Sequence, residues 1–527
     1  MTFFSPEFAL CFMIFFVIYW SFAKFVLVQK WLILIASYAF ICLNSISFGI
    51  ILFIYTCFIF FTGKWLLARV FFTQIANFQK SDELRLQIQS LKEKKETQKT
   101  PKRRYKAEPD NLEQKIQALE EELEKKAKES KILEQNINKY LLLSIVFICV
   151  LFLAFFKYYD FVYEFFTNIF GLEIVASVAF PLGISYYTFM SITYLVATSK
   201  GKCVKYNTFL NLACFLAFFP SIVMGPISRA TSEKGFKPLL PQFSKPKKFT
   251  KSDEIFTLII FACVKLLLIA GLLGPFVNDI FASVYSSDYS CMQLLSAILL
   301  YGVVLYGNFS GFIDLVRALA LCLGFELAQN FTMPYARSNI KEFWHSWHIT
   351  LTTFIIRYIY IPLGGSKHGF WRTQFNVLIA FVLSGIWHGV GLNFLVWGAL
   401  HGLGFVIFNF YKKFVNIQFN YYFGVLLTYT FVSFVWVFFA NDFESAITIF
   451  SSFTRLELYH NYSEFIIILL IFLGVAFYHK SAGLFSWSVI VLQNTAFVPK
   501  VLILGLIFTL IIALMPSGIP SFIYASF

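Results

Sequence analysis

The sequence predicts an all-α polytopic membrane protein with roughly eleven to thirteen transmembrane or re-entrant helices. Of its 527 residues, 58% are hydrophobic and only 14% are charged, whereas soluble domains carry about 25% charged residues. Windows of about 20 apolar residues, the length that crosses a bilayer, recur along nearly the whole chain. The repeated pattern of about ten residues per strand that marks a membrane barrel is absent, so helices are expected.

The expected membrane segments follow from these windows. The first apolar run has no basic start and is too long for the core of a signal peptide, so we expect a retained first helix. The nine cysteines are scattered and form no CxxC pair, which indicates core packing and not a disulfide or zinc framework. The segments are, in order, 8–27, 31–48, 49–67, 140–156, 209–224, 255–273, 294–305, 375–387, 421–439, 465–478 and 501–514.

A charged island interrupts the apolar sequence at 77–139. Residues 80–139 carry 29 of the 72 formal charges, 16 basic and 13 acidic. Two arms flank a basic tip that contains Pro101 and Pro109, and each arm has apolar residues at 3–4 spacing, as in a coiled-coil seam. We expect an antiparallel helical hairpin inserted between two spans. The apolar positions are Leu84, Ile88 and Leu91 in one arm, and Leu112, Ile116, Leu119, Leu123, Leu133 and Ile137 in the other.

The island divides the chain into four expected parts: N-terminal transmembrane helices (1–76), the coiled-coil hairpin (77–139), a membrane core (140–515) and a C-terminal tail (516–527). We interpret the hairpin as a solvated structural insert. The alternative is that it docks an unknown partner or acidic lipid headgroups. Basic loops favour the cytoplasm. The hairpin tip, the run SKPKKFTK (244–251) and Lys412-Lys413 are therefore expected inside, and both chain termini outside.

The seven histidines all follow residue 340. His388 lies in an apolar run beside glycines, where an ionisable group is a functional candidate. His348 lies in an amphipathic segment that reads as an interfacial or re-entrant helix. The structural alternative for His388 is a buried histidine satisfied by a backbone carbonyl. His401 is expected to serve helix packing.

His345 and His348 are three residues apart, which would suit two ligands on one helix face. We expect no metal, because no third ligand with suitable spacing is near. His460 and His479 are expected in loops or at interfaces. No Walker loop, GxSxG motif or dinucleotide-binding fingerprint occurs, so ATP hydrolysis and a soluble hydrolase domain are not indicated.

One long motif carries a resemblance to a known family. Residues 301–403 contain the elements FSG…D, FWHSWHITLT, YIPLGG and GIWHG, and related stretches stand upstream as FPLGISYYTFMSITYLV (180–196) and FFPSIVMGPISR (218–229). Together they resemble the membrane-bound O-acyltransferase family, in particular its bacterial branch that acylates cell-envelope polysaccharides such as peptidoglycan and alginate. The resemblance covers most of the chain outside the charged island.

The resemblance implies a helical body around a central tunnel, with the acyl donor entering from the cytoplasm and the acceptor from outside. His388, in GIWHG, matches the family's active-site histidine, and His348, in WHITL, matches the second motif histidine of the branch. The implied donor is acetyl-CoA, and no bound cofactor is implied. The implied localisation is the bacterial cytoplasmic (inner) membrane.

The chemistry of acyl transfer suggests further site residues. A base must take the proton of the acceptor hydroxyl, and donors must face the developing oxyanion. His388 is the expected base. Basic residues are expected where the donor phosphates enter, although anchoring at the cytoplasmic interface explains them equally well. The expected tunnel-wall residues are Tyr306, Asn308, Ser310, Trp344 and Trp387, and the expected donor-binding residues are Arg357, Lys367 and Arg372. Asp314 and Arg317, three apart in an apolar helix, are expected to pair.

The chain ends in FIYASF (522–527), an aromatic tail after two helix-breaking prolines. It is similar to a C-terminal acyl-carrying motif that accompanies the teichoic acid D-alanylation members on a small separate subunit. The likeness implies that Tyr524 takes the acyl group as a phenyl ester, with help from His388, and presents it to an external SGNH-type acyltransferase. The alternative is an aromatic anchor at the membrane interface.

The sequence therefore predicts an enzyme that exports an acetyl group to an envelope polysaccharide. Peptidoglycan is the first choice of final acceptor, alginate or another exopolysaccharide the second, and D-alanylation of teichoic acid the third. A secondary transporter would show inverted repeats and carboxylate pairs at the midplane, but the sequence shows no such repeat, and its histidines cluster in one half. A non-catalytic scaffold that displays the hairpin is the remaining alternative. Lipids are the expected surroundings, and no nucleic acid is expected.

Overall fold

The fold is entirely helical in the part of the chain that can be described. The computed structural model describes residues 5–98, 109–170, 178–232, 236–283, 285, 289–415 and 417–516. These ranges contain no β-strand. Eight of their helices are long and apolar enough to cross a membrane, and four shorter helices are also apolar. The prediction of an all-α polytopic membrane protein is confirmed.

Two short apolar helices, α1 (Pro6–Ser21) and α2 (Val26–Cys42), begin the described chain. Ser5 caps α1, since its hydroxyl accepts a hydrogen bond from the Phe8 amide at 3.2 Å. The turn between the helices falls at residues 22–25. The expected segments 8–27 and 31–48 therefore have different bounds in the structure, because apolar windows carry no signal for a turn built from apolar residues.

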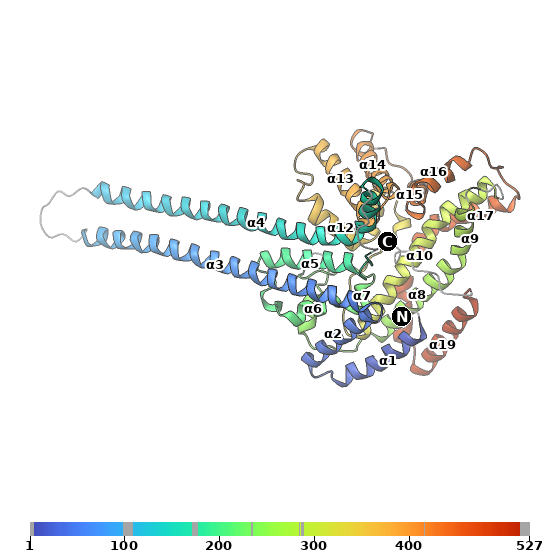
Figure 1. Ribbon diagram of the computed structural model, residues 1–527, viewed down its shortest axis with the longest axis horizontal. Coiled ribbons are helices and arrows are strands. Elements are labelled where there is room, and N and C mark those ends of the chain that lie inside the picture. The colour runs from blue at the N-terminus through green and yellow to red at the C-terminus, as the bar shows by residue number, and fades with distance from the viewer. Residues whose placement is uncertain are drawn as a thin grey trace.

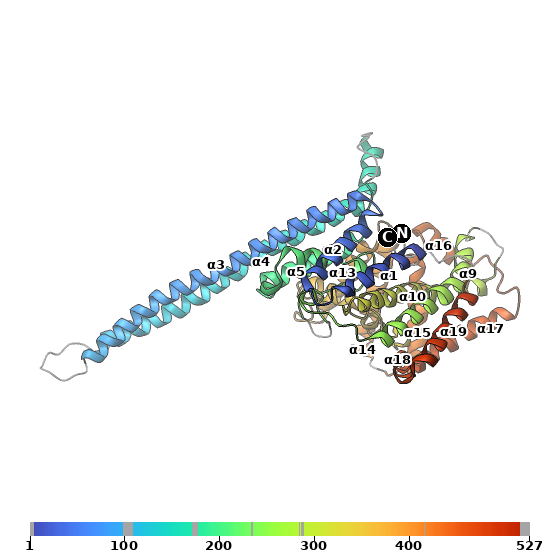
Figure 2. The same cartoon turned by 90° about the horizontal axis from the view of Figure 1, so that it is seen from below.

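The charged island forms an antiparallel hairpin of two very long helices, α3 (Ile46–Gln98) and α4 (Pro109–Phe170). Figures 1 and 2 show these helices side by side, projecting far from the helical body. Each helix runs without interruption between a membrane-length apolar segment and a charged arm. Among the described side chains of the arms, Ile88 and Ile116 are buried, and an exposed ion pair joins Lys92 to Glu120 at 2.8 Å. Such an exposed pair contributes little, about 0–1 kcal/mol.

The remaining elements form the body. The expected segment 209–224 is divided at Phe218, because Pro220 starts a new helix there. The elements are α5 (Ile184–Ser199), η1 (Val204–Tyr206), α6 (Phe209–Ala217), α7 (Phe219–Ile222), η2 (Leu240–Ser244), α8 (Ser252–Cys263), η3 (Val264–Ala270), α9 (Gly271–Ala282), α10 (Cys291–Cys322), η4 (Pro334–Ala336), α11 (Ile340–Ser346), α12 (Ile349–Ile355), η5 (Ile356–Tyr360), α13 (Phe370–His388), α14 (Leu392–Phe414), α15 (Tyr421–Ala440), α16 (Phe443–Ser452), α17 (Ser463–Phe477), η6 (Tyr478–Ser481), α18 (Leu484–Asn494) and α19 (Phe497–Leu514).

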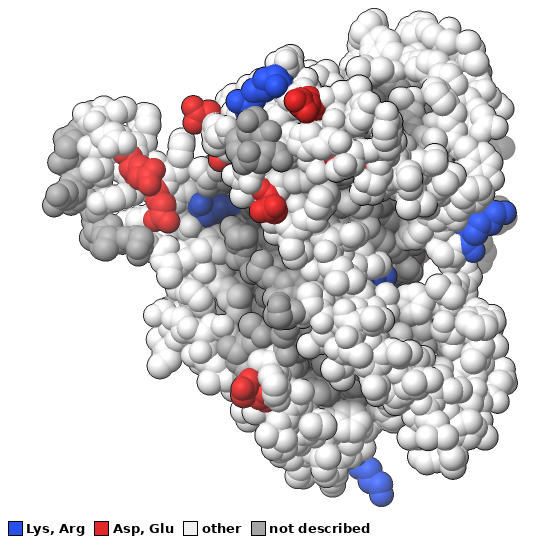
Figure 3. Space-filling view, turned by 90° about the vertical axis from the view of Figure 1, so that its right-hand side faces the viewer, with Lys and Arg blue, Asp and Glu red and all other residues white. Residues whose placement is uncertain are grey.

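Helix α10 is the central helix of the body. Of the 18 residues in its most apolar stretch, 78% are buried. The helix packs against α8, η3, α9, α15 and α17. Its one acidic side chain, Asp314, pairs with Lys265 at 2.6 Å and with Arg317 at 3.6 Å. The predicted Asp314–Arg317 pair is therefore present, with a second cation from η3. Figure 3 shows that most of the described surface on the face opposite the hairpin tip is uncharged.

The segment with the motif histidines is broken into short pieces. Helices α11 and α12 are seven residues each, and between them Trp347 is extended and His348 has φ of +43°. This is the left-handed region, which L-residues other than glycine and asparagine adopt infrequently. The break keeps this segment from forming a single span and turns His348 into the protein interior.

Helices α13 and α14 approach each other unusually closely. A Cβ atom on Gly385 of α13 would lie 2.3 Å from the Phe394 carbonyl oxygen, and one on Gly398 of α14 would lie 2.5 Å from the Phe381 carbonyl oxygen. Small residues let two helix backbones meet in this way. The contact fixes the end of α13, where His388 lies.

Candidate active site

The site is built around His388, the last residue of α13. The helix has 19 residues, so at 1.5 Å per residue the Cα of His388 lies about 27 Å from that of Phe370 at its start. The imidazole is buried, 4% exposed. Its ring centroid lies 4.5 Å from Trp387, 4.9 Å from Trp397 and 5.2 Å from Phe439. The histidine is thus held in an aromatic shell deep in the protein.

Helix α4 holds the end of α13 through two hydrogen bonds. The Lys157 ammonium donates to the His388 carbonyl oxygen at 3.0 Å, and the Tyr158 hydroxyl donates to the Ile386 carbonyl oxygen at 2.5 Å. The last carbonyl groups of a helix have no partner within it, so these donors satisfy groups that would otherwise be orphaned. The hairpin helix α4 therefore reaches the backbone of the candidate base.

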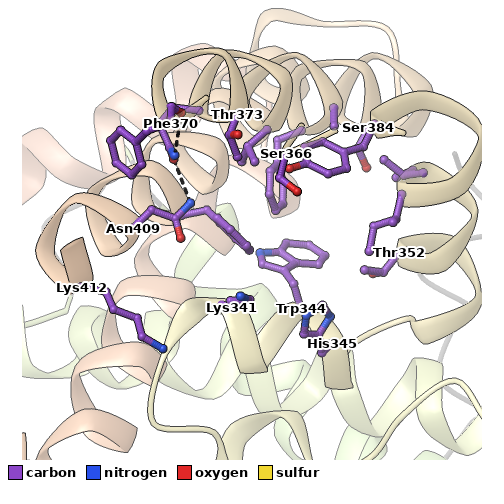
Figure 4. Close-up of a pocket in the computed structure, with 18 of the residues that line it drawn as sticks. Lys341, Trp344, His345, Thr352, Ser366, Phe370, Thr373, Ser384, Asn409 and Lys412 are labelled. Atoms are coloured by element: carbon purple, nitrogen blue, oxygen red, sulfur yellow. Dashed lines mark hydrogen bonds between the residues drawn. The ribbon is translucent and has the colours of Figure 1, made fainter. Parts of the chain in front are cut away.

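A large cavity lies beside α13, between this helix and α11, α12, η5 and α14. Its volume is about 690 Å³, within the range of small-molecule sites. Figure 4 shows Trp344 reaching into it, with Lys412 at one end and Ser384 at the other. One face of α13 lines it from end to end at 3–4 spacing, through Phe370, Thr373, Gln374, Val377, Ala380, Phe381 and Ser384.

The large cavity has a basic end. Lys341 of α11 and Lys412 and Lys413 of α14 line it, together with His345. Partial burial, with a contribution from the positive charge of Lys341, lowers the pKa of His345 below its usual 6.5. Lys412 and Lys413 supply the positive charge of this end, and Lys341 adds a third cation to the lining of the cavity.

A second, small cavity of about 50 Å³ lies at His388 itself. Lys157 of α4, Ser185 and Tyr186 of α5, and Trp387 also line it. Ser384, at the inner end of the large cavity, is four residues before His388, so the two side chains lie on the same face of α13. His388 thus continues the row of residues that lines the large cavity and contributes to the small one.

Two other histidines are buried near His388. The Trp397 ring contacts both His388 and His401, at 4.9 Å from one imidazole and 5.0 Å from the other. His348 is 1% exposed and packs edge-on against Phe309 at 4.9 Å, and His401 is fully buried between Trp344 and Trp397. Neither imidazole has a hydrogen-bond partner among the described residues, and neither lines the two cavities.

His345 lies on α11, whereas His348 lies in the break before α12, and only His348 is buried. The pair therefore does not share one helix face. No cluster of three or more histidine, cysteine, aspartate or glutamate side chains that could hold a metal occurs in the part of the chain that the structure describes.

The predicted wall residues are divided by the fold. Trp344 lines the large cavity and Trp387 the small one. Tyr306, Asn308 and Ser310 lie on α10 and line neither cavity. The Tyr306 hydroxyl instead accepts a hydrogen bond from the Tyr478 hydroxyl at 2.9 Å. Two tryptophans, Trp347 and Trp436, stand between its ring and the aromatic shell of His388.

The predicted donor-binding residues Arg357, Lys367 and Arg372 are exposed and lie near the basic end of the large cavity without lining it. The predicted tail residue Tyr524 lies outside the described residues.

Comparison with known proteins decides the family. The family model described as the membrane-bound O-acyltransferase family matches residues 132–441. This range includes His348 and the whole of α13 with His388. The chain belongs to the membrane-bound O-acyltransferase family. The matched region begins within α4 and ends just after α15, so it contains the candidate site and leaves out most of the hairpin.

Several curated relatives of this O-acyltransferase-family chain are bacterial. It is 34% identical over 275 residues to a probable alginate O-acetylase of Azotobacter vinelandii, covering 51% of this chain and 53% of the relative. It is 30% identical over 328 residues to a peptidoglycan O-acetyltransferase of Helicobacter pylori (56% and 61%). It is 24% identical over 250 residues to a teichoic acid D-alanyltransferase of Bacillus subtilis (44% and 60%). The chain thus spans little more than half the length of these relatives.

Sequence reasoning missed the charged groups nearest the two cavities. Lys157 is the only charged residue between Lys139 and Asp160, so a lone cation in an apolar run was the signal that could have found it. In the sequence, Lys412 and Lys413 indicated only which side of the membrane their loop faces. Lys341 carried no signal, because its place beside the cavity depends on how α11 packs against α13 and α14.

Proposed function

We propose that this chain is an O-acyltransferase that takes an acetyl group from acetyl-CoA on the cytoplasmic side and passes it across the membrane towards an envelope polysaccharide. The observation that carries the proposal is the continuous face of α13. That face lines a large cavity with a basic end and terminates in His388, which lines a second cavity. In this proposal the large cavity holds the donor with its anionic phosphates at the basic end, and the acceptor hydroxyl meets His388 at the small cavity.

His388 acts as the general base. As it takes the proton of the acceptor hydroxyl, the hydroxyl oxygen attacks the thioester carbonyl carbon, and the resulting intermediate collapses to an ester. The departing thiolate of coenzyme A then recovers the proton from the imidazolium. The aromatic shell excludes water from the thioester, which favours transfer over hydrolysis.

The proposed orientation follows from the basic residues. The three lysines of the large cavity and the basic hairpin tip lie in the cytoplasm of a bacterial cell, and both termini lie outside its inner membrane. The length of α13 then carries the reaction about 27 Å away from the cavity's basic end. Peptidoglycan is our first choice of acceptor and alginate the second. Relatives named for each are 30% and 34% identical, so identity does not separate them.

The tail supplies the last step of the proposal. Tyr524 forms a phenyl ester, and because the phenol pKa is near 10, phenolate leaves more easily than an alkoxide. An external SGNH-type acyltransferase then takes the acetyl group to the polysaccharide. The chain that leads to the tail rests on α9, where a Cβ atom on Gly271 would lie 3.1 Å from the Cγ atom of Pro516.

Replacement Tyr524→Phe is expected to abolish stable labelling of the full chain by radiolabelled acetyl-CoA, since phenylalanine has no hydroxyl to esterify. The label is counted on the denatured protein, and mild alkali should release it from the wild type. Tyr462→Phe, at a tyrosine that is 76% exposed, is the matched control and should label normally. Undiminished labelling of Tyr524→Phe would refute the tyrosine ester and leave His388 chemistry standing.

Replacement of Lys412 or Lys413 by methionine is expected to raise the KM for acetyl-CoA roughly tenfold or more each, with kcat little changed. A charge-assisted hydrogen bond to a phosphate contributes about 1.5 kcal/mol or more in binding. Steady-state release of coenzyme A measures both constants, and added salt should weaken the wild type more than the variants.

Arg372→Met provides the matched control, because Arg372 is a cation near the same end that does not line the cavity. Its KM should stay within twofold of wild type. A raised KM for Arg372→Met with unchanged values for the lysine variants would place the donor phosphates on the outer basic residues and not in the large cavity.

A further inference from the structure

Lys157 is a cation placed at the candidate base by an otherwise apolar stretch. It belongs to the membrane-length segment Lys139–Ile169 of α4 and lies eighteen residues past Lys139, or about 27 Å along the helix. Its side chain and that of His388 both line the 50 Å³ cavity, so α4 and α13 bring a lysine and a histidine together there.

The surroundings of the Lys157 ammonium leave it able to bind a further group. One of its three N–H donors goes to the His388 carbonyl oxygen at 3.0 Å, and its Nζ atom lies 5.6 Å from the centre of the Trp387 ring. No carboxylate among the described residues pairs with it, and it makes no other hydrogen bond to them. A cation at membrane depth is costly and is by default a functional candidate.

A purely structural role accounts for only part of this arrangement. The ammonium satisfies a carbonyl group at the end of α13 and lies favourably at a helix C-terminus. Tyr158, the next residue, already satisfies the Ile386 carbonyl oxygen with a neutral hydroxyl. A neutral donor could therefore have capped His388 as well, and the positive charge inside the cavity needs another reason.

We propose that Lys157 is a catalytic residue that stabilises the oxyanion formed during acyl transfer. The inference rests on the proposed function, because it takes His388 as the base of that reaction. When the acceptor oxygen bonds to the thioester carbonyl carbon, the carbonyl π pair moves onto oxygen, and the acceptor proton goes to His388. A second N–H of Lys157 donates to this oxygen. When the intermediate collapses, the carbon–sulfur bond breaks, the oxygen pair re-forms the carbonyl, and the thiolate takes the proton from His388.

The charge explains why the position carries a lysine and not a second tyrosine. The oxyanion bears charge that the ground-state thioester lacks, so a fixed cation in a dry cavity favours the transition state over bound substrate. The effect should therefore fall on kcat and leave the binding of acetyl-CoA nearly unchanged.

The test uses the full chain with acetyl-CoA and follows coenzyme A release together with thermal unfolding. Lys157→Met, which keeps the length of the side chain, should lower kcat by about 10²- to 10³-fold with KM within threefold of wild type. Lys157→Arg restores the charge and should recover at least a tenth of the wild-type kcat. Tyr158→Phe removes the neighbouring cap and should stay within about threefold of wild type.

The outcomes separate the inference from the function on which it rests. Equal losses in Lys157→Met and Tyr158→Phe, with lowered unfolding temperatures, would show capping alone and overturn the proposal. A rise in KM with unchanged kcat would show ground-state binding and also overturn it. If His388→Gln abolishes coenzyme A release while Lys157→Met does not slow it, Lys157 does not stabilise the oxyanion, and the proposed acyltransferase function stands. If His388→Gln has no effect, the proposed function itself fails.

Discussion

The replacement His388→Gln is expected to lower the rate of coenzyme A release by between about 10²- and 10⁴-fold, the contribution of a positioned general base. Glutamine keeps a polar side chain of similar reach but cannot take a proton at neutral pH. His388 lines the small cavity and continues the α13 face that lines the large one, so no neighbouring histidine can replace it in both respects. Initial rates at saturating acetyl-CoA measure the effect.

His401→Gln is the matched control for this experiment. His401 is as deeply buried as His388 and is surrounded by the same kind of aromatic rings, at 4.9 Å from Trp344 and 5.0 Å from Trp397, but it lines neither cavity. Its variant should keep a rate within about tenfold of wild type, after correction for the folded fraction. Comparable losses in both variants would mean that the histidines act through packing and would remove His388 from its role as base.

The replacement Gly398→Leu is expected to cause the largest loss of folded protein among the changes considered. A Cβ atom there would lie 2.5 Å from the Phe381 carbonyl oxygen and 3.2 Å from the Gly385 Cα atom. Backbone cannot give way as a flexible side chain can, so α13 and α14 must separate. Overpacking of a well-packed contact costs about 1–3 kcal/mol or more, and here it also displaces His388 from Lys157. Thermal unfolding in detergent and the activity of the remaining folded protein measure both effects.

Gly505→Leu is the control, because a Cβ atom on Gly505 meets nothing within 4 Å and its helix α19, like α14, is long and apolar enough to cross a membrane. It should unfold within about 2 °C of wild type. An unchanged unfolding temperature for Gly398→Leu would show that the α13–α14 contact is not the fixed element that positions His388.

The sequence predicted the fold class and the candidate base because both leave local signals. Apolar windows mark membrane helices regardless of how they pack, and His388 stands in a motif whose glycines now have a physical reason at the α13–α14 crossing. The uninterrupted course of α3 and α4 from membrane segment to charged arm was not predicted, since composition changes abruptly where the helices do not.

The groups around the cavities were harder to predict, because they meet only in three dimensions. Tyr306, Asn308 and Ser310 share an apolar helix with a family motif, yet α10 turns them away from both cavities. Lys157 follows directly on the expected segment 140–156, so the sequence predicts a position beyond the span for it. In the structure α4 continues through it to Phe170. Arg357 and Arg372 lie in the right region of the sequence, but helical phase places them on the outer surface.

The central claim, that an acyl group leaves a cytoplasmic thioester and crosses the membrane through His388, is tested most directly in sealed vesicles of known orientation. Acetyl-CoA labelled in the acetyl group is supplied only on the hairpin side. Peptidoglycan or alginate fragments and the external SGNH-type acyltransferase are supplied only on the other. We expect coenzyme A to be released on the hairpin side and labelled acetyl ester to form on the opposite side, and we expect both to be lost in His388→Gln. Intact acetyl-CoA on the opposite side, or equal ester formation in His388→Gln, would contradict it.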